Sequence, residues 1–243
     1  MIVGIHQPHY FPWMGYYDKM AKSDTFILMD DVQLEKGSLM YRNRILTATG
    51  KVEYLTISGD KHGYLDKKYW QLQSTNNDVW LTKHKNALRA AYGKSPWFDE
   101  VWSRIEDLFV NDESTICAYA ARSVLRVKEL LEIPTRIVYQ HDLTTDAEAH
   151  KNNLVIALCQ AVGGDRYLSG NGARKYTDED SFAAAGLQIR YQQFTQPAYP
   201  QAHAAEFVPG ISMLDMLFNC GIEETKRIFW ETCRSVQEFS ERG

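Results

Sequence analysis

The sequence predicts an α/β fold with a Rossmann-like, mostly parallel sheet and helices on both faces. Residues 1–5 and 25–29 form two short continuous apolar runs, and a segment with helical character lies between them. Buried parallel strands are apolar on both faces, and parallel neighbours need a long crossover that is usually a helix. In addition, strand-like and helix-like segments alternate along most of the remaining chain, which is typical of an α/β sandwich.

The remaining elements are predicted from hydrophobic periodicity and from the residues that end each run. Residues 42–58 predict a hairpin that turns at residues 48–50, and residues 62–77 are polar and irregular, as in a surface loop or flap. The clearest helix is residues 114–132, which ends before Pro134. Further helices are expected over residues 78–92, 96–109, 154–162, 181–185, 212–218 and 223–233, and further strands over 135–139, 165–170 and 187–194. We therefore expect one α/β domain over residues 1–243, with a helical insertion at 78–132.

Composition excludes several classes of protein. The 243 residues carry a net charge of -4 and have an isoelectric point near 6.0, which argues against general nucleic-acid binding because that function needs a basic surplus. The apolar runs are far too short to span a membrane, and the N-terminus enters a strand with no basic region or cleavage site. The four cysteines are widely spaced, which disfavours a zinc site and fits a reducing compartment. We expect a cytoplasmic protein.

Polar clusters follow the first two predicted strands. They consist of His6, Gln7 and His9 after the first strand and of Asp30, Asp31 and Gln33 after the second. Ligands of open parallel sheets bind beyond the carboxyl ends of the strands, so we expect both clusters to face one crevice. The histidines can bind metal, act as general bases, bind phosphate or hydrogen-bond a tight turn; we predict contact with substrate or nucleotide, and no metal site. The carboxylates can bind Mg²⁺, accept an amine proton, hold a sugar hydroxyl or form a turn.

Three later segments supply further candidates. Alternation places Arg42 and Arg44 on one face of a strand, which suits phosphate or carboxylate and fits a solvated face equally well. The glycine-rich segment 169–174 follows a strand, so its backbone can approach an anion closely, although a plain turn is nearly as consistent. Tyr199 and Gln201 lie in an irregular, proline-containing segment, where they have no evident role in regular structure. No sequence motif for a nucleophile is present.

Six segments in order resemble the WbqC-like protein family. They are I-H-Q-P-H-Y-F-P-W-M-G-Y-Y-D-K from residue 5, D-D-V-Q from 30, R-N-R-I from 42, Y-L-S-G-N-G-A-R-K-Y from 167, Y-P-Q from 199 and S-M-L-D-M-L-F-N-C-G from 212. The family occurs in gene clusters for O-antigen lipopolysaccharide and related surface polysaccharides, and one member has been suggested to be a glycine transferase. The resemblance implies a cytoplasmic enzyme that acts on a nucleotide-linked amino sugar or a similar amine.

The layout is also similar to that of nucleotidyltransferases of the H-x-G-H type. Residues 13–16, Trp-Met-Gly-Tyr, stand where those enzymes carry the motif, and residues 169–174 stand where they carry a phosphate-contacting loop. Both motif histidines are replaced by aromatic residues, so phosphate contacts would have to come from His6 or His9. Some of these enzymes activate a carboxylate as an adenylate and pass it to an amine. This analogy implies ATP with Mg²⁺, whereas the residues themselves leave the cofactor unidentified.

These observations predict an enzyme that attaches an aminoacyl group, with glycyl as one candidate, to an amino sugar or related amine. It would be an acyl transferase or an ATP-dependent ligase, with His6 or His9 as general base and Asp31 orienting the amine or a metal. The predicted substrate- and phosphate-binding residues are Gln7, Tyr10, Trp13, Lys19, Asp30, Gln33, Arg42, Asn43, Arg44, Ser169, Gly170, Asn171, Arg174, Tyr199 and Gln201. The alternative is a non-catalytic sugar-nucleotide binding or scaffold protein.

The partners follow from the same interpretation. We expect a small-molecule substrate, a nucleotide-linked amino sugar, and no membrane-spanning segment. Nucleic acid enters this interpretation only as an aminoacyl-tRNA donor. The sequence leaves open the acyl donor, the use of a metal and the oligomeric state.

Overall fold

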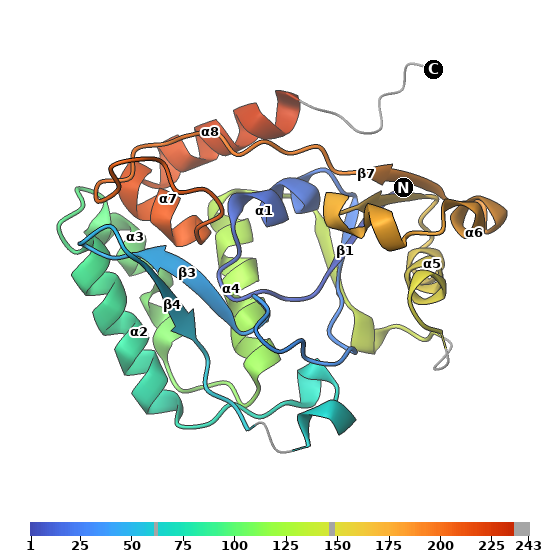
Figure 1. The fold of residues 1–243 in the computed structure, drawn as a ribbon, viewed down its shortest axis with the longest axis horizontal. Helices are drawn as coiled ribbons and strands as arrows, with labels where there is room; N and C mark the ends of the chain where they lie inside the picture. The colour runs from blue at the N-terminus through green and yellow to red at the C-terminus, as the bar shows by residue number, and fades with distance from the viewer. Residues whose placement is uncertain (61–62, 146–148, 236–243) are drawn as a thin grey trace.

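A computed structural model of the chain describes residues 1–60, 63–145 and 149–235. Within these ranges, five parallel strands form one sheet in the order β5-β2-β1-β6-β7 (Figure 1). The strands are β1 (Ile2–His6), β2 (Thr25–Leu28), β5 (Arg136–Tyr139), β6 (Arg166–Ser169) and β7 (Gln188–Tyr191). The predicted Rossmann-like parallel sheet is therefore confirmed.

Helices cover both faces of this sheet, as predicted. Val3, Ile5 and Ile27 share an apolar cluster with α5 (Asn152–Ala161) and α6 (Glu179–Ala184), whereas the alternate residues Phe26 and Leu28 pack with α1 (Met14–Ala21) and α4 (Ile116–Leu130). Figure 1 shows α5 and α6 on the opposite side of the sheet from α1 and α4. The two faces explain why the strands are continuously apolar in sequence.

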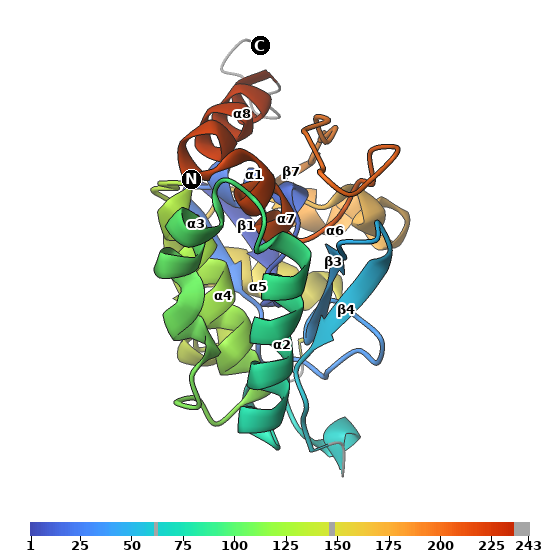
Figure 2. The same ribbon diagram turned by 90° about the vertical axis from the view of Figure 1, so that its left-hand side faces the viewer.

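The larger apolar cluster continues away from the sheet. It includes residues of α2 (Asn77–Tyr92), α3 (Phe98–Ile105), α7 (Met213–Cys220) and α8 (Ile222–Ser235). The hairpin of β3 (Arg42–Leu46) and β4 (Val52–Thr56) lies beside α2 (Figure 2). That residues 78–132 form an insertion in a single domain stays a prediction. None of the helices in the described ranges has the length and apolar character needed to cross a membrane.

The segment predicted as a polar loop over residues 62–77 contains a buried anchor. It forms two short 3₁₀ turns, η1 (Tyr64–Asp66) and η2 (Tyr69–Gln71), and residue 62 lies outside the described ranges. Tyr69 is fully buried, and its hydroxyl donates to the Met40 carbonyl at 2.7 Å. The backbone N–H groups of Tyr69 and Trp70 donate to the carbonyls of Val32 and Asp30, respectively. Because the segment is mostly polar, the sequence did not predict that Tyr69 is buried. Tyr69 connects the segment by hydrogen bonds to the chain after β2.

Candidate functional site

The order of the strands reverses between β1 and β6. From β1 the chain adds β2 and β5 on one side and later adds β6 and β7 on the other. Open parallel sheets bind ligands in the crevice that forms at such a reversal, beyond the carboxyl ends of the strands. His6 ends β1 and Gln7 follows it, while Ser169 ends β6 and Gly170 follows it. We call the region between these two strand ends, where the rule for parallel sheets expects a ligand, the β1–β6 crevice. The fold therefore brings together two segments that lie more than half of the chain apart.

Three aromatic rings cluster at the carboxyl end of β1. The His6 and His9 ring centroids are 4.5 Å apart, and both rings contact Tyr16 of α1, at 5.0 and 5.5 Å. The Gln7 carbonyl accepts hydrogen bonds from the Tyr16 hydroxyl at 3.1 Å and from His6 Nδ1 at 3.2 Å. His9 Nδ1 is buried and has no hydrogen-bond partner within the described ranges. A buried polar atom in this state calls for an explanation, such as a ligand.

Lys19 of α1 adds a buried amine to this cluster. Its side chain is 3% exposed, and Nζ donates to the Ile5 carbonyl at 2.6 Å. Burial lowers the pKa of Lys19 to about 7, and burial together with the Lys19 charge lowers the pKa of His9 to about 4. Burial is also the main cause that lowers the pKa of His6, followed by the charges of His9 and Lys19. A bound anion would reverse these shifts, because an opposite charge favours the protonated forms.

The β6 side of the crevice is an open, glycine-containing segment. Ser169 is fully buried, and residues Asn171–Tyr176 form the 3₁₀ helix η5. A Cβ added at Gly170 or Gly172 would meet no atom within 4 Å, and neither glycine has a positive φ. The protein's own packing therefore does not require glycine at either position, and a glycine backbone permits a ligand to approach closely.

A second polar region lies beyond the carboxyl ends of β2 and β5. Asp30 is 1% exposed and accepts two hydrogen bonds from His141, one from Nδ1 at 2.5 Å and one from the backbone N–H at 3.1 Å. Burial raises the pKa of Asp30, and the contacts with His141 oppose that rise. The next residue, Asp31, accepts a hydrogen bond from the Trp70 indole at 2.8 Å, and the Trp70 ring stacks on His141.

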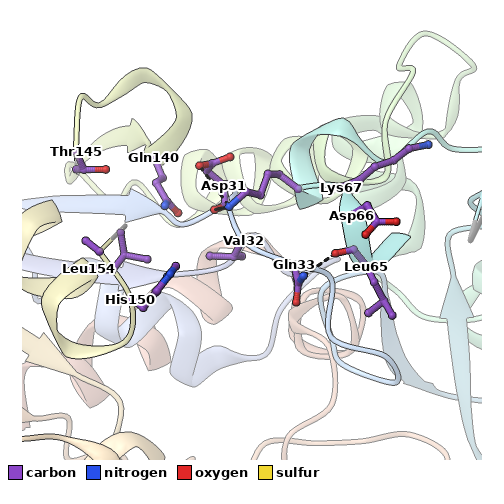
Figure 3. Close-up of a pocket in the computed structure, with 12 residues that line it drawn as sticks. Asp31, Val32, Gln33, Leu65, Asp66, Lys67, Gln140, Thr145, His150 and Leu154 are labelled. Atoms are coloured by element: carbon purple, nitrogen blue, oxygen red, sulfur yellow. Dashed lines mark hydrogen bonds and ion pairs between the residues drawn. The ribbon is translucent and has the colours of Figure 1, made fainter. Parts of the chain in front are cut away.

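A pocket of about 420 Å³ adjoins this second region (Figure 3). Its polar lining includes Asp31, Gln33, Gln140 and the residues around Lys67. Figure 3 shows Gln33 and Leu65 at one end of the pocket, where Gln33 Nε2 donates to the Leu65 carbonyl at 2.6 Å. The volume falls within the range of small-molecule sites. Within the described residues, no group of three or more metal-ligating side chains is present.

Tyr69 lies between the two regions. Its hydroxyl is 3.3 Å from the Pro8 carbonyl, which belongs to the first region, and its backbone N–H donates to the Val32 carbonyl, which belongs to the second. The polar clusters after β1 and β2 thus lie at one edge of the sheet, as expected for parallel neighbours, but in separate surroundings.

The chain matches the model of the WbqC-like protein family over residues 7–227, which is most of its length. It belongs to the WbqC-like protein family. A relative from Mycobacterium tuberculosis (strain ATCC 25618 / H37Rv), named uncharacterized protein Rv1507c, is 31% identical over 224 residues, which cover 91% of this chain and 94% of the relative. No solved structure matches the chain.

Several predicted binding residues of this WbqC-like protein make contacts within the protein. The Tyr10 hydroxyl is 3.1 Å from His84 Nδ1, and the buried Asn43 amide donates to the Phe11 carbonyl at 2.7 Å. Arg44 donates to the Gly210 carbonyl at 2.5 Å. Trp13 packs edge-on against Phe194. These contacts do not test ligand binding by the same residues, which stays a prediction.

Two further predicted residues, Arg42 and Arg174, also have partners within the protein. Arg42 donates to the Gly37 carbonyl at 2.7 Å and lies over the Tyr54 ring, and the Arg174 guanidinium lies 4.9 Å from the Tyr191 ring centroid. Asn171 is exposed at the start of η5. Arg174 and Asn171 thus remain near the β6 side of the crevice, whereas Arg42 lies on the hairpin.

Tyr199 and Gln201 converge on a buried carboxylate in this WbqC-like protein. Asp215 of α7 is fully buried and accepts hydrogen bonds from Tyr92, Tyr199 and Gln201 at 2.7, 2.9 and 3.0 Å. Burial raises the pKa of Asp215, while these three donors oppose the rise. The irregular segment around Tyr199 is therefore fixed by a buried carboxylate of α7.

Sequence reasoning missed His141, Trp70 and Gln140. His141 and Gln140 directly follow β5, so the rule that selected polar residues after β1 and β2 also applies to them. Trp70 carried no comparable signal, because it belongs to the segment interpreted as a surface loop. Trp70 belongs to the site only through its contacts with Asp31 and His141, two residues that are distant from it in sequence.

Proposed function

We propose that this protein is an enzyme that transfers an activated acyl group, with an aminoacyl group as the first candidate, to the amine of a sugar or a related compound. The acceptor nitrogen attacks the acyl carbonyl carbon, a C–N bond forms, and the bond to the leaving group breaks with its electron pair. The nitrogen loses one proton to a base. The membership of the WbqC-like family supports a role in surface-polysaccharide synthesis as the context of this proposal.

One observation carries the proposal: a buried amine with no acidic partner lies where the strand order reverses. Lys19 makes no ion pair within the described part of the chain, and its charge lowers the pKa of both neighbouring histidines. Buried charges are normally paired. A phosphate or phosphate-linked group of the donor would supply the missing negative charge.

The residues around Lys19 receive roles from this assignment. His6 and His9 would become protonated donors to the anion, and Gln7, Ser169 and the backbone near Gly170 would complete its surroundings. A pKa of about 4 makes His9 a weak proton acceptor in the free protein, because the best general bases have a pKa near the working pH. We therefore propose that His9 contacts the anion, in place of the predicted role as general base.

Thermal-shift measurements with ATP and Mg²⁺, UDP- and dTDP-amino sugars, and acyl-CoA test the anion site, since a ligand of the native state raises the midpoint of unfolding. Calorimetry in buffers of different ionisation enthalpy then measures proton uptake. We expect binding of at least one phosphate-containing ligand with net proton uptake below pH 7. Absence of any such binding would contradict the proposal.

The alternative is a sugar-nucleotide binding or scaffold protein without turnover. It is favoured by one observation: the four cysteines are buried, so none is placed as an exposed nucleophile. Direct transfer needs no covalent enzyme intermediate, so this observation does not decide between the two functions. Ligand binding by the wild-type protein, without amide formation in any donor and acceptor combination, would favour the alternative.

A further inference from the structure

Asp30 fixes His141 in one orientation. The carboxylate accepts from both Nδ1 and the backbone N–H of His141, so the Nδ1 proton points toward Asp30. In the neutral ring, this leaves the lone pair on Nε2, the nitrogen that can accept a proton. The same arrangement, in which a buried carboxylate orients a histidine base, recurs in unrelated enzymes.

The remaining surroundings of His141 keep the ring accessible. The ring stacks on Trp70, with centroids 5.3 Å apart and planes inclined by 27°, and it also contacts Tyr139 of β5. The His141 side chain is 36% exposed, in contrast to the 1% of Asp30. Nε2 lies 3.5 Å from the exposed carboxylate of Asp142. The His141 ring thus reaches solvent, whereas Asp30, which orients it, lies in the protein interior.

The adjoining pocket is lined by Gln140 and Asp31, the sequence neighbours of His141 and Asp30, together with the cations Lys67 and Lys68, and His141 lies just outside this lining. Gln140, which precedes His141, is 4% exposed and lines the pocket, and its Oε1 atom is buried without a partner in the described residues. Asp31, which follows Asp30, lines the same pocket and is held by the Trp70 indole. Carbonyl and carboxylate oxygens accept hydrogen bonds and do not donate them. An occupant that hydrogen-bonds to these two oxygen-bearing side chains carries N–H or O–H groups.

We propose that this pocket binds the acceptor, a sugar that bears a primary amine, and that His141 takes the proton from its nitrogen. The inference rests on the proposed transfer function and assigns its acceptor half to the region after β2 and β5. The neutral amine attacks the carbonyl carbon of an acyl phosphate anhydride or thioester, the amide bond forms, and the leaving group departs as its anion. The proton passes to Nε2 of His141 and from there to solvent.

Several titratable groups surround His141. Asp30 faces Nδ1, Asp142 faces Nε2, and Tyr139 contacts the ring. Trp70, which stacks on His141, donates its indole N–H to Asp31, and Asp31 is paired with Lys68. Acidic groups thus outnumber basic ones among the charged neighbours of the ring.

NMR of the full-length protein with ¹⁵N-labelled histidine tests the acceptor site without turnover, using methyl glucosaminide and methyl glucoside as probes. We expect the His141 signals, identified by their loss in His141→Gln, to shift saturably with the glucosaminide and less with the glucoside. Asp31→Asn should weaken this binding roughly tenfold, as expected for a hydrogen bond to a charged group. Asp99→Asn on α3, a matched change outside the pocket, should leave it unchanged.

The outcomes separate this inference from the proposed function. Binding of a phosphate ligand at the β1–β6 crevice without any response of His141 to the glucosaminide would overturn the inference alone. A response of His141 without any phosphate-ligand binding would contradict the proposed function and leave the sugar site supported.

Once a donor is known, His141→Gln should lower kcat by roughly 10²–10⁴-fold, the usual contribution of a general base. It should leave the donor KM unchanged. An unchanged kcat would overturn the base assignment.

Discussion

The two polar regions at the carboxyl edge of the sheet differ in the sign of the charge that they hold. The region after β1 buries an amine and two histidines with lowered pKa, and its buried amine has no acidic partner in the described residues. The region after β2 and β5 buries a carboxylate that is already paired with a histidine, and it adjoins a pocket lined by both acidic and basic side chains. Under the two proposals above, the first region would bind an anionic donor group and the second the amine of the acceptor, with Tyr69 hydrogen-bonded to the backbone of both.

Replacing His9 with Ala gives the sharpest test of this comparison. We expect the loss of one hydrogen-bond donor to the anion to lower kcat/KM for the phosphate-containing donor roughly 10–100-fold, as expected for a hydrogen bond to a charged group. Circular dichroism and the unfolding midpoint should stay close to those of the wild type. Wild-type turnover in the variant would show that the anion site is wrongly placed.

Lys19→Met should change affinity and stability in opposite directions. Loss of the ammonium group should weaken binding of phosphate-containing ligands roughly 10–100-fold, as expected for hydrogen bonds to charged groups. Since the Lys19 amine is buried without an ion-pair partner in the described part of the chain, the apolar replacement should raise the unfolding midpoint. Isothermal calorimetry and thermal unfolding measure the two effects. A simultaneous loss of affinity and stability would indicate a structural role.

Tyr199→Phe tests whether the third polar cluster serves the fold. The buried Asp215 carboxylate would lose one of three donors, so we expect the free energy of unfolding to fall by about 1–3 kcal/mol. Affinity for phosphate ligands and for the glucosaminide should not change. Urea unfolding provides the measurement, and a selective loss of sugar binding would instead support the predicted sugar contact of Tyr199.

The pH dependence of stability tests the buried amine directly. The pKa of Lys19 is about 7 in the folded protein and 10.5 ordinarily, so between these values the unfolded state binds more protons. Stability must therefore rise with pH in this window. Between pH 7 and 9, we expect wild type to gain up to about 1.4 kcal/mol per pH unit relative to Lys19→Met. Parallel curves for the two proteins would contradict the assigned pKa.

Gly172→Ala should have the smallest effect. Because the added Cβ meets no neighbour within 4 Å, we expect the free energy of unfolding to stay equal or rise by up to about 1 kcal/mol through the lower entropy of the unfolded chain. Affinity for phosphate-containing ligands should fall a few-fold if the backbone approaches the anion. Equal affinity in both proteins would remove this segment from the site.

The sequence by itself determined the fold class and the edge of the sheet where polar groups gather. Continuous apolar runs predicted strands that are buried on both faces, and polar residues such as His6 and Asp30 indicated where those strands end. These features are local, because each depends on the composition of one short segment and on the general geometry of parallel sheets.

Tertiary structure decided which polar groups pair with one another and which remain available. Asp30 and His141 meet although 111 positions separate them, and Tyr199 meets Asp215 in the interior. The lowered pKa of Lys19 likewise depends on burial by elements that are distant in sequence. Hydrophobic periodicity indicates which face of an element is buried, but hydrogen-bond partners and desolvation arise only when several elements pack together, since both depend on distances between non-local atoms.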